Sequence, residues 1–393
     1  MKTKSSLQNV RRGTRASLLY AYLWSLCVHF SMPALAQSIY STPYTFTTLA
    51  GKADSDRAGG AAGPERISHP RGLAVDTEGN VYVANTRNHT ICRITPAGGV
   101  TTLAGRAGCA GSVDGTGSEA RFCYPQNLAV DEANILYVAD SGNNTIRRVT
   151  PAGAVTTLAG LARHFGTADG TGGDARFNYP NSVAVDCAGN IYVADLYNAT
   201  IRKVTRAGVV TTLAGKAGSF GSADGKGSAA QFNVPLCVAV DSAGNVYVAD
   251  SFNNAIRKVT SAGEVTTLVG KLTYSSGSAD ATGSAAQFFN PCGLVVDNAT
   301  NVYVADGGNH TIRRVTAAGT VTTLAGLAGH SGSADGTGSA ARFWNPISIA
   351  LDRTGNLYVA DLGNAAIRKG TLARLTSTPA SRPTDGSFSF TAP

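Results

Sequence analysis

The chain has 393 residues and a formal charge of +8, and it contains 46 glycines but only 15% charged residues. Average soluble domains contain roughly 7% glycine and about 25% charged residues. The composition therefore excludes a coiled coil and a disordered acidic chain, and it disfavours a helical bundle. A hydrophobic fraction of 43% is still large enough to fill a core.

The first 36 residues have the composition of a removable export signal. They contain five basic residues and no acidic ones, and an apolar stretch over residues 16–30 is followed by Ala34, Leu35 and Ala36. This order is typical of a secretory signal peptide, and the stretch is shorter than the roughly 20 residues that span a membrane. We expect a signal peptide over residues 1–36, export to the periplasm or the extracellular space, and no membrane span after cleavage.

Removal of the signal segment would also remove most of the positive charge. Without residues 1–36, the chain keeps 28 basic and 25 acidic residues, a net charge of +3. No basic stripe interleaved with aromatic residues remains, so the sequence does not predict a nucleic-acid partner.

Beyond residue 44 the chain consists of a repeat of about 55 residues, which indicates a propeller or a solenoid. Two short strings mark the repeat, and their spacing varies by one residue. TTLAG or a close copy begins at residues 47, 101, 156, 211, 266 and 322, and YVAD or YVAN begins at residues 82, 137, 192, 247, 303 and 358.

Each repeat predicts four short antiparallel strands. In the third repeat they are residues 182–186, 191–195, 201–205 and 209–214, which are rich in Val, Ile, Tyr and Thr and are separated by Gly, Asn and Asp. The first two strands are apolar on both faces, so neighbouring sheets must cover each sheet on both sides. The third strand carries Arg and Lys and is expected farther out.

The chain begins out of phase with its repeat, which favours a closed ring. Residues 46–51 (FTTLAG) supply a spare fourth strand, whereas the last repeat has only a degraded one. The spare strand would complete the last sheet and leave no sheet uncovered. We predict an all-β, six-bladed β-propeller of four-stranded antiparallel blades over residues 37–376, closed by the N-terminal strand, and a flexible tail over residues 377–393. An open solenoid would need terminal caps that the sequence does not show.

The repeats resemble those of a known family. PRGLAVD at residues 70–76, GNVYVAN at residues 79–85 and NHTI at residues 88–91 are similar to NHL repeats. The SADGTGSAARF pattern between repeats is similar to bacterial exported NHL proteins and to the NHL section of teneurins. This resemblance covers residues 45–371 and implies a propeller that serves as a binding platform, but it names no ligand, since the family includes protein-binding, RNA-binding and lyase members.

Two sets of recurrent aspartates suggest metal ligands, but a structural role explains them more simply. A calcium site needs six to eight oxygens, whereas each linker offers one carboxylate, so we interpret the linker set as turn caps followed by a one-turn helix and a Phe that packs between blades. We interpret the second set, with Asn85 in the first repeat, as part of Asx-type turns. The linker set is Asp114, Asp169, Asp224, Asp280 and Asp335, and the second set is Asp140, Asp195, Asp250, Asp306 and Asp361.

Function is expected where the repeats differ. The linkers and the turns between the second and third strands should share one face, because antiparallel strands alternate their ends. Exposed aromatic residues on that face suit contacts with a sugar or a protein. The candidate ligand-binding residues are Tyr124, Phe165, Tyr179, Tyr197, Phe220, Phe252, Tyr274 and Trp344.

We therefore expect a non-enzymatic propeller without a cofactor, which binds a protein or a glycan through its loop-rich face. The alternative is a metal-assisted lyase or hydrolase near the axis, with His69, His164 and His330 as candidate ligands. These histidines show no metal-ligand spacing, so the blades would have to bring them together.

Six cysteines follow the signal segment, at no common position in the repeat. Cys109 and Cys123 flank one linker and are the candidate disulfide in an oxidising compartment. Cys237 and Cys292, which open inner strands of adjacent blades, are a second and weaker pair, and the alternative for each cysteine is a buried thiol.

Overall fold

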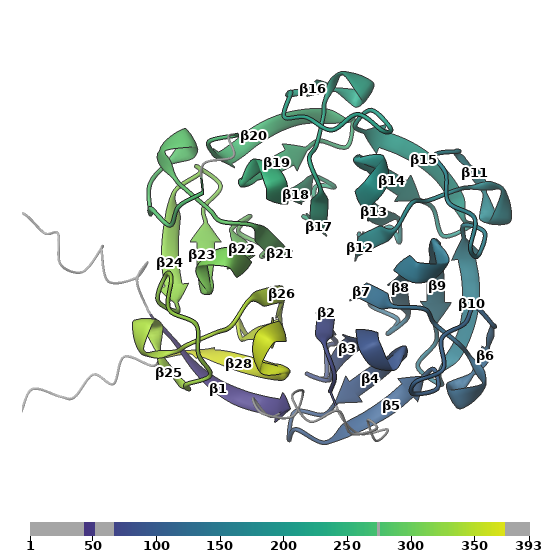
Figure 1. The fold of residues 1–393 in the computed structure, drawn as a ribbon, viewed down its shortest axis with the longest axis horizontal. Helices are drawn as coiled ribbons and strands as arrows, with labels where there is room; N and C mark the ends of the chain where they lie inside the picture. The colour runs from purple at the N-terminus through teal and green to yellow at the C-terminus, as the bar shows by residue number, and fades with distance from the viewer. Residues whose placement is uncertain (1–42, 52–66, 273–275, 374–393) are drawn as a thin grey trace, which may run out of the picture. The chain divides into compact units, whose positions relative to one another are not determined.

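A computed structural model describes residues 43–51, 67–272 and 276–373. These residues form six antiparallel sheets around an axis, which confirms the predicted propeller (Figure 1). The predicted signal peptide, the predicted tail and Tyr274 lie outside the described residues. Within the described ranges no helix is long and apolar enough to span a bilayer, since every helical segment is a three-residue turn.

Each blade is a meander that runs outward from the axis. Blade 1 contains β2 (Pro70–Val75), β3 (Val81–Asn85), β4 (Thr90–Ile94) and β5 (Val100–Ala104), and blade 2 contains β7 (Pro125–Val130), β8 (Leu136–Asp140), β9 (Thr145–Val149) and β10 (Ala154–Ala159). Blade 3 contains β12 (Pro180–Val185), β13 (Ile191–Asp195), β14 (Thr200–Val204) and β15 (Val209–Ala214), and blade 4 contains β17 (Pro235–Val240), β18 (Val246–Asp250), β19 (Ala255–Val259) and β20 (Glu264–Gly270). Blade 5 contains β21 (Pro291–Val296), β22 (Val302–Asp306), β23 (Thr311–Val315) and β24 (Val321–Ala325), and blade 6 contains β26 (Pro346–Leu351), β27 (Leu357–Asp361), β28 (Ala366–Leu372) and β1 (Tyr44–Gly51).

Short 3-10 turns connect these strands in two places. One set joins the second and third strands of each blade: η1 (Thr86–Asn88), η3 (Ser141–Asn143), η5 (Leu196–Asn198), η7 (Ser251–Asn253), η9 (Gly307–Asn309) and η11 (Leu362–Asn364). The other set lies in the linkers and confirms the predicted one-turn helices: η2 (Gly117–Glu119), η4 (Gly172–Asp174), η6 (Gly227–Ala229), η8 (Gly283–Ala285) and η10 (Gly338–Ala340).

Four blades carry a fifth strand that the sequence did not predict. It is formed by two residues of the preceding linker and pairs with the rim strand, as β11 pairs with β15. In blade 5, where Ala281 replaces the usual glycine, a single bridge between Thr282 and Thr320 takes its place. Two residues are too few to show an alternating pattern. These strands are β6 (Gly115–Thr116), β11 (Gly170–Thr171), β16 (Gly225–Lys226) and β25 (Gly336–Thr337).

The core lies between the blades rather than inside any one of them. One cluster joins Tyr82 and Ala84 of blade 1 to Leu128 and Val138 of blade 2, with the linker residue Phe122 between them. Every linker Phe is fully buried, which confirms the predicted packing role: Phe122, Phe177, Phe232, Phe288 and Phe343.

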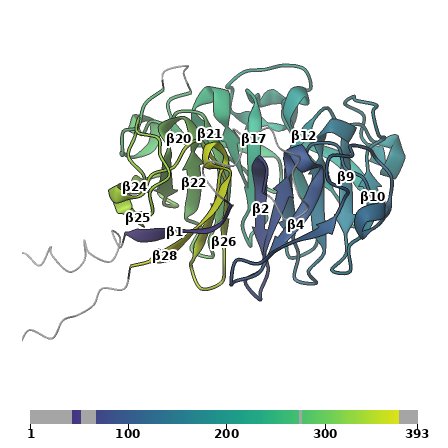
Figure 2. The ribbon, with the colours of Figure 1, turned by 60° about the horizontal axis from the view of Figure 1, so that its bottom comes forward.

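The N-terminal strand closes the ring. Strand β1 pairs with β28 on one side and with β25 on the other, and Figure 2 shows β1 beside β28. Phe46 lies opposite Gly370, and the equivalent pair in blade 3 is Val210 and Val204. A side chain at Gly370 would collide with the Phe46 ring. The large residue on β1 therefore fills the space that the small residue on β28 leaves.

A buried arginine ties each of blades 2 to 6 to its linker. In blade 4, the Arg257 guanidinium lies 2.6 Å from the Asp250 carboxylate and 2.6 Å from the linker residue Asp224, and it stacks 5.4 Å from the centre of the Phe232 ring. Burial raises the pKa of Asp250 to about 6, although the charge of Arg257 opposes this rise. The equivalent arginines, all buried, are Arg147, Arg202, Arg313 and Arg368.

This network corrects two interpretations of the sequence. The linker aspartates are structural, as expected, but they pair with an arginine instead of only capping a turn. The second set does not form Asx turns: the Asp250 side chain accepts hydrogen bonds from Asn253 Nδ2 (2.8 Å) and from the backbone N–H of Asn233 (2.7 Å). The third strand does lie farther from the axis than the first two, as expected, but the first of its basic residues in blades 2 to 6 is fully buried.

Blade 1 replaces both charges together. Asn85 stands where Asp140 stands in blade 2, and Cys92 stands where Arg147 stands. The Asn85 amide donates to the Cys92 thiol over 3.5 Å, and its oxygen accepts the N–H of Ser68 at 2.7 Å. Neither charge is left unpaired, because both are absent.

We expect Arg257→Ala to lower the free energy of unfolding by about 3–5 kcal/mol, because it leaves two carboxylates without their cation. Lys258→Ala, on the next residue, should cost no more than about 1 kcal/mol, since it removes only a contact with the Tyr247 ring. Denaturant midpoints of the two variants measure the difference. Equal midpoints would show that the buried network contributes nothing specific.

We expect Phe46→Ala to lower the free energy of unfolding by about 3–5 kcal/mol, because it opens a cavity between the first and last strands. Thr47→Ala changes an exposed neighbour on the same strand and should be neutral within about 0.5 kcal/mol. Thermal and denaturant unfolding measure both variants. A neutral Phe46→Ala would contradict closure by this strand.

Candidate functional site

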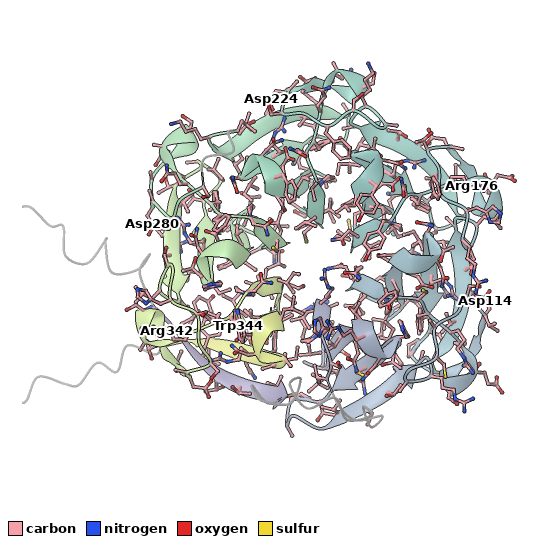
Figure 3. The ribbon with its side chains drawn as sticks, viewed as in Figure 1. Asp114, Arg176, Asp224, Asp280, Arg342 and Trp344 are labelled. Atoms are coloured by element: carbon pink, nitrogen blue, oxygen red, sulfur yellow. The ribbon has the colours of Figure 1, made fainter. Side chains whose placement is uncertain are left out.

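The upper face is the end of the ring at which the inner strands β2, β7, β12, β17, β21 and β26 begin. The 3-10 turns between second and third strands meet the ends of the linkers there, as predicted: the N–H of Tyr197 donates to the carbonyl of Asn178 at 3.1 Å. Scaffold carboxylates lie farther out, and Figure 3 shows Asp114 and Asp224 at the rim while Trp344 lies nearer the axis.

The residue before each inner-strand proline has a left-handed backbone, with φ between 48° and 57°. In four of the six blades a side chain from the turn of the preceding blade accepts its N–H. The N–H of Tyr124 donates to His89 Nδ1 at 3.1 Å, and the N–H of Tyr179 donates to Asn144 Oδ1 at 2.8 Å. These six residues surround the axis: His69, Tyr124, Tyr179, Val234, Asn290 and Asn345.

The residue after each proline points toward the axis and forms what we call the mouth ring. Its members enclose a space of about 20 Å³, which is close to the size of one water molecule. Blades 1 to 3 contribute a guanidinium and two amides, whereas blades 4 to 6 contribute two aliphatic side chains and a thiol. The mouth ring is Arg71, Gln126 and Asn181 on the polar side and Leu236, Cys292 and Ile347 on the apolar side.

Hydrogen bonds order part of the polar side. Gln126 is only 5% exposed, and its Nε2 donates to the Tyr179 hydroxyl at 3.3 Å. Asn181 Nδ2 donates to the carbonyl of Leu236 at 2.6 Å, across to the next blade. Burial raises the pKa of Tyr179, and the positive charge of Arg71 opposes that rise. Arg71 and Tyr179 therefore act on each other over the axis.

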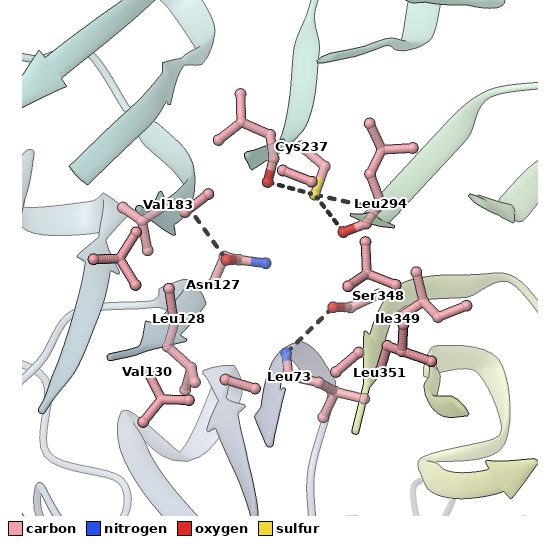
Figure 4. A pocket seen from close by; sticks show the side chains of 18 of the residues that line it. Leu73, Asn127, Leu128, Val130, Val183, Cys237, Leu294, Ser348, Ile349 and Leu351 are labelled. Atoms are coloured by element: carbon pink, nitrogen blue, oxygen red, sulfur yellow. Dashed lines mark hydrogen bonds between the residues drawn. The ribbon is translucent and has the colours of Figure 1, made fainter. Parts of the chain in front are cut away.

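Beneath the mouth ring, side chains join neighbouring inner strands in a girdle (Figure 4). Ser348 Oγ accepts the N–H of Leu73 at 3.2 Å, and Cys237 Sγ accepts the N–H of Leu294 at 3.3 Å. The axial channel below has a volume of about 190 Å³ and is lined mostly by Val, Leu, Ile and Ala. The wall of this channel therefore offers few side-chain partners to a polar substrate.

Four consecutive blades present one exposed aromatic residue each, and we call this set the aromatic arc. In blades 3 and 4 it comes from the 3-10 turn, and in blades 5 and 6 it comes from the linker end and covers a glycine of that turn; the Trp344 ring, for example, covers Gly363. The arc consists of Tyr197, Phe252, Phe289 and Trp344, with exposed fractions of 52%, 53%, 46% and 45%.

Phe289 was not predicted as a binding residue, although a pattern in the sequence identifies it. Where the middle residue of the turn is aromatic, the linker end carries Asn, and where the turn residue is Gly308 or Gly363, the linker end carries Phe289 or Trp344. The other candidates lie in two places. Tyr124 and Tyr179 lie at the mouth, whereas Phe165 (72% exposed) and Phe220 (50% exposed) lie on the outer linkers.

The candidate metal ligands do not come together. His164 and His330 occupy the same position in linkers three blades apart, and His69 lies beside the axis. Among the described residues no three His, Cys, Asp or Glu side chains are grouped to hold a metal ion. Cys109 and Cys123 are unbridged in the structure, as are Cys237 and Cys292.

The NHL repeat family model matches four segments, residues 68–94, 122–148, 177–204 and 232–259. NHL repeat-containing protein 2 of Bos taurus is 27% identical over 340 residues, which cover 78% of this chain and 47% of that protein. Teneurin-m of Drosophila melanogaster is 28% identical over 232 residues, which cover 52% of this chain and 8% of that protein.

A similar fold occurs in an auxiliary nutrient binding protein from Bacteroides ovatus, with a TM-score of 0.61 and 20% identity over 84% of this chain and 77% of that one. The chain spans half or less of the length of the curated relatives that it matches first. These comparisons confirm the predicted repeat and fold.

The His89 contact predicts a dependence of stability on pH. Burial lowers the pKa of His89, and its Nδ1 must stay unprotonated to accept the N–H of Tyr124. As the pH falls below about 6.5, this histidine takes up a proton in the unfolded chain before it does so in the folded chain. Protonation therefore favours unfolding, and the contribution of His89 to the free energy of unfolding is lost as the pH falls.

His89→Asn keeps an acceptor, as Asn144 does in the next blade, but does not titrate. We expect wild type to lose stability relative to His89→Asn between pH 7.5 and pH 5, measured by denaturant midpoints. Parallel curves for the two proteins would contradict this role of His89.

Proposed function

The chain belongs to the NHL-repeat proteins, and on that premise we propose that it is an exported, non-enzymatic binding protein that holds a glycan on its upper face, over the mouth ring. The basic, apolar and small-residue order of residues 1–36 supports export. The binding surface consists of Tyr124 and Tyr179 at the mouth, together with the aromatic arc.

One observation carries this proposal: the scaffold positions of blades 2 to 6 are nearly alike, whereas the mouth positions differ from blade to blade. Scaffold positions recur from blade to blade, whereas the mouth ring is polar in blades 1 to 3 and apolar in blades 4 to 6. A structural role alone does not require this division, because each mouth position has the same backbone around it. A ligand with one polar and one apolar side would account for it.

A glycan suits these side chains better than an extended apolar segment does. Sugar rings pack flat on tyrosine faces, and their hydroxyls pair with amides such as Gln126 and Asn181. The aromatic residues of the arc stand apart on separate blades, so they do not form one continuous apolar patch. The Bacteroides protein of similar fold is described as nutrient binding, which agrees with a soluble ligand of this kind.

We expect Tyr124→Ala and Tyr179→Ala each to weaken binding of a soluble oligosaccharide by about three- to tenfold, because each removes a stacking face. The ligand is first selected on an array of neutral and acidic oligosaccharides, and affinities are then measured by titration calorimetry.

Val209→Ala is the matched control, since Val209 is an exposed apolar residue on rim strand β15. It should leave the affinity unchanged, and all three variants should keep the unfolding temperature of wild type within a few degrees. An array on which no oligosaccharide binds would overturn the proposal, as would tyrosine variants that bind like wild type.

A further inference from the structure

We propose that the ligand bears a carboxylate which Arg71 binds at the mouth, so that the ligand class is an acidic oligosaccharide of uronic acid units. This inference rests on the proposed function and narrows it to one kind of sugar. Three observations carry it: the environment of Arg71, the neutral core of blade 1, and the open acceptor on Gln126.

Arg71 has no anionic partner among the described residues. Within the described part of the chain it makes no ion pair and no hydrogen bond, whereas the buried arginine of each of blades 2 to 6 has two carboxylate partners. It is half-buried at the mouth. A guanidinium there, with its planar set of donors, favours a carboxylate held by two parallel hydrogen bonds.

Its charge reaches across the axis. Burial and the nearby Asp306 carboxylate raise the pKa of Cys292, on blade 5, to about 12, and the charge of Arg71 opposes that rise, as it does at Tyr179 on blade 3. Arg71 lines the same space of about 20 Å³ as the other five members of the mouth ring, so an anion in that space would lie close to its guanidinium. The other five members of the mouth ring include no acidic residue to repel it.

The core of blade 1 supplies no carboxylate beside the turn that could pair with Arg71. In blade 2 the N–H of Cys123, two residues before the proline, donates to the carboxylate of Asp140 at 2.7 Å. In blade 1 the equivalent N–H, that of Ser68, donates at 2.7 Å to the neutral amide of Asn85. Blade 1 therefore lacks the carboxylate that the other blades bury beside the turn, and its one buried carboxylate among the described residues, Asp76, lies at the lower end of β2.

Gln126 supplies a second element of recognition. Its Nε2 has partners, but its Oε1 is buried at the mouth and has no hydrogen-bond partner among the described residues. A buried acceptor without a donor is energetically unfavourable, and a donor from a ligand would remove that cost. A carboxylate has no donor to offer, but the hydroxyl next to it on a uronic acid ring does.

The size of the mouth sets the orientation. The space inside the ring, about 20 Å³, admits no sugar ring. The carboxylate therefore points into the mouth toward Arg71, and the sugar ring lies above it against Tyr124 and Tyr179. In this orientation the carboxylate faces the guanidinium of Arg71, and the sugar ring faces the two tyrosine rings.

The test uses trimers of galacturonic acid and glucuronic acid, their methyl esters, a neutral galactose trimer and an acidic hexapeptide, with titration calorimetry of the full propeller. Wild type should bind at least one acid trimer about tenfold or more tightly than its ester. Arg71→Ala should weaken binding of the acid by a similar factor and leave the ester unchanged. Arg353→Ala removes an exposed cation from a turn at the opposite end of the ring and should have no effect.

Each other outcome overturns the inference in a distinguishable way. An ester that binds as tightly as its acid, or an Arg71→Ala variant that binds the acid like wild type, contradicts the carboxylate contact. Binding of the neutral trimer alone leaves the glycan function standing and removes the acidic class. Binding of the hexapeptide alone, or of none of the probes, removes the uronate ligand, and hexapeptide binding also counts against the glycan function. Unfolding temperatures of both arginine variants show whether they remain folded.

Discussion

The whole structure depends on covering both faces of every sheet. The inner strands of each blade are apolar on both faces, and no blade has a core of its own, so a blade is stable only between two neighbours. A row of six such sheets would leave two faces bare, whereas a ring leaves none. The ring closes because β1 is donated to the last blade, where Phe46 fills the space opposite Gly370.

Closure also produces the site. The first and last inner strands lie 275 residues apart in the chain, yet the backbone N–H of Leu73 on β2 donates a hydrogen bond to Ser348 on β26. Once the ring is closed, a single position of the repeat becomes six side chains around one axis. A change in one repeat then alters one sector of the mouth without disturbing the scaffold. The polar sector of blades 1 to 3 and the aromatic arc of blades 3 to 6 are both changes of this kind.

Periodicity predicted most of the fold, because the signals that it rests on recur six times. The strands of blade 3 begin and end within about two residues of their predicted bounds, and the out-of-phase start predicted the role of β1. The buried arginines were missed, because an Arg within a strand indicates exposure unless its partners are known, and those partners lie 7 and 33 residues away. The joint change to Asn85 and Cys92 in blade 1 was a signal of that pairing.

The site could be predicted only in part. The aromatic residues of the upper face were located from the alternation of strand ends, but Phe289 was overlooked. It occupies the same linker position as Trp344, and that position becomes informative only when the glycine in the adjacent turn is considered together with it. Arg71 and Gln126 were not among the predicted binding residues. Only the closed ring shows that they meet at the axis, since the sequence does not say which residues of the inner strand face it.

Hydrogen exchange of the backbone amides of residues 44–51 tests closure most directly. The account predicts that this segment exchanges as slowly as residues 154–159 and 209–214, the rim strands of blades 2 and 3, because it is paired on both sides in the same way. Exchange of residues 44–51 at the rate of an unpaired chain, while the other two segments stay protected, would contradict the closed ring and with it the site at its centre.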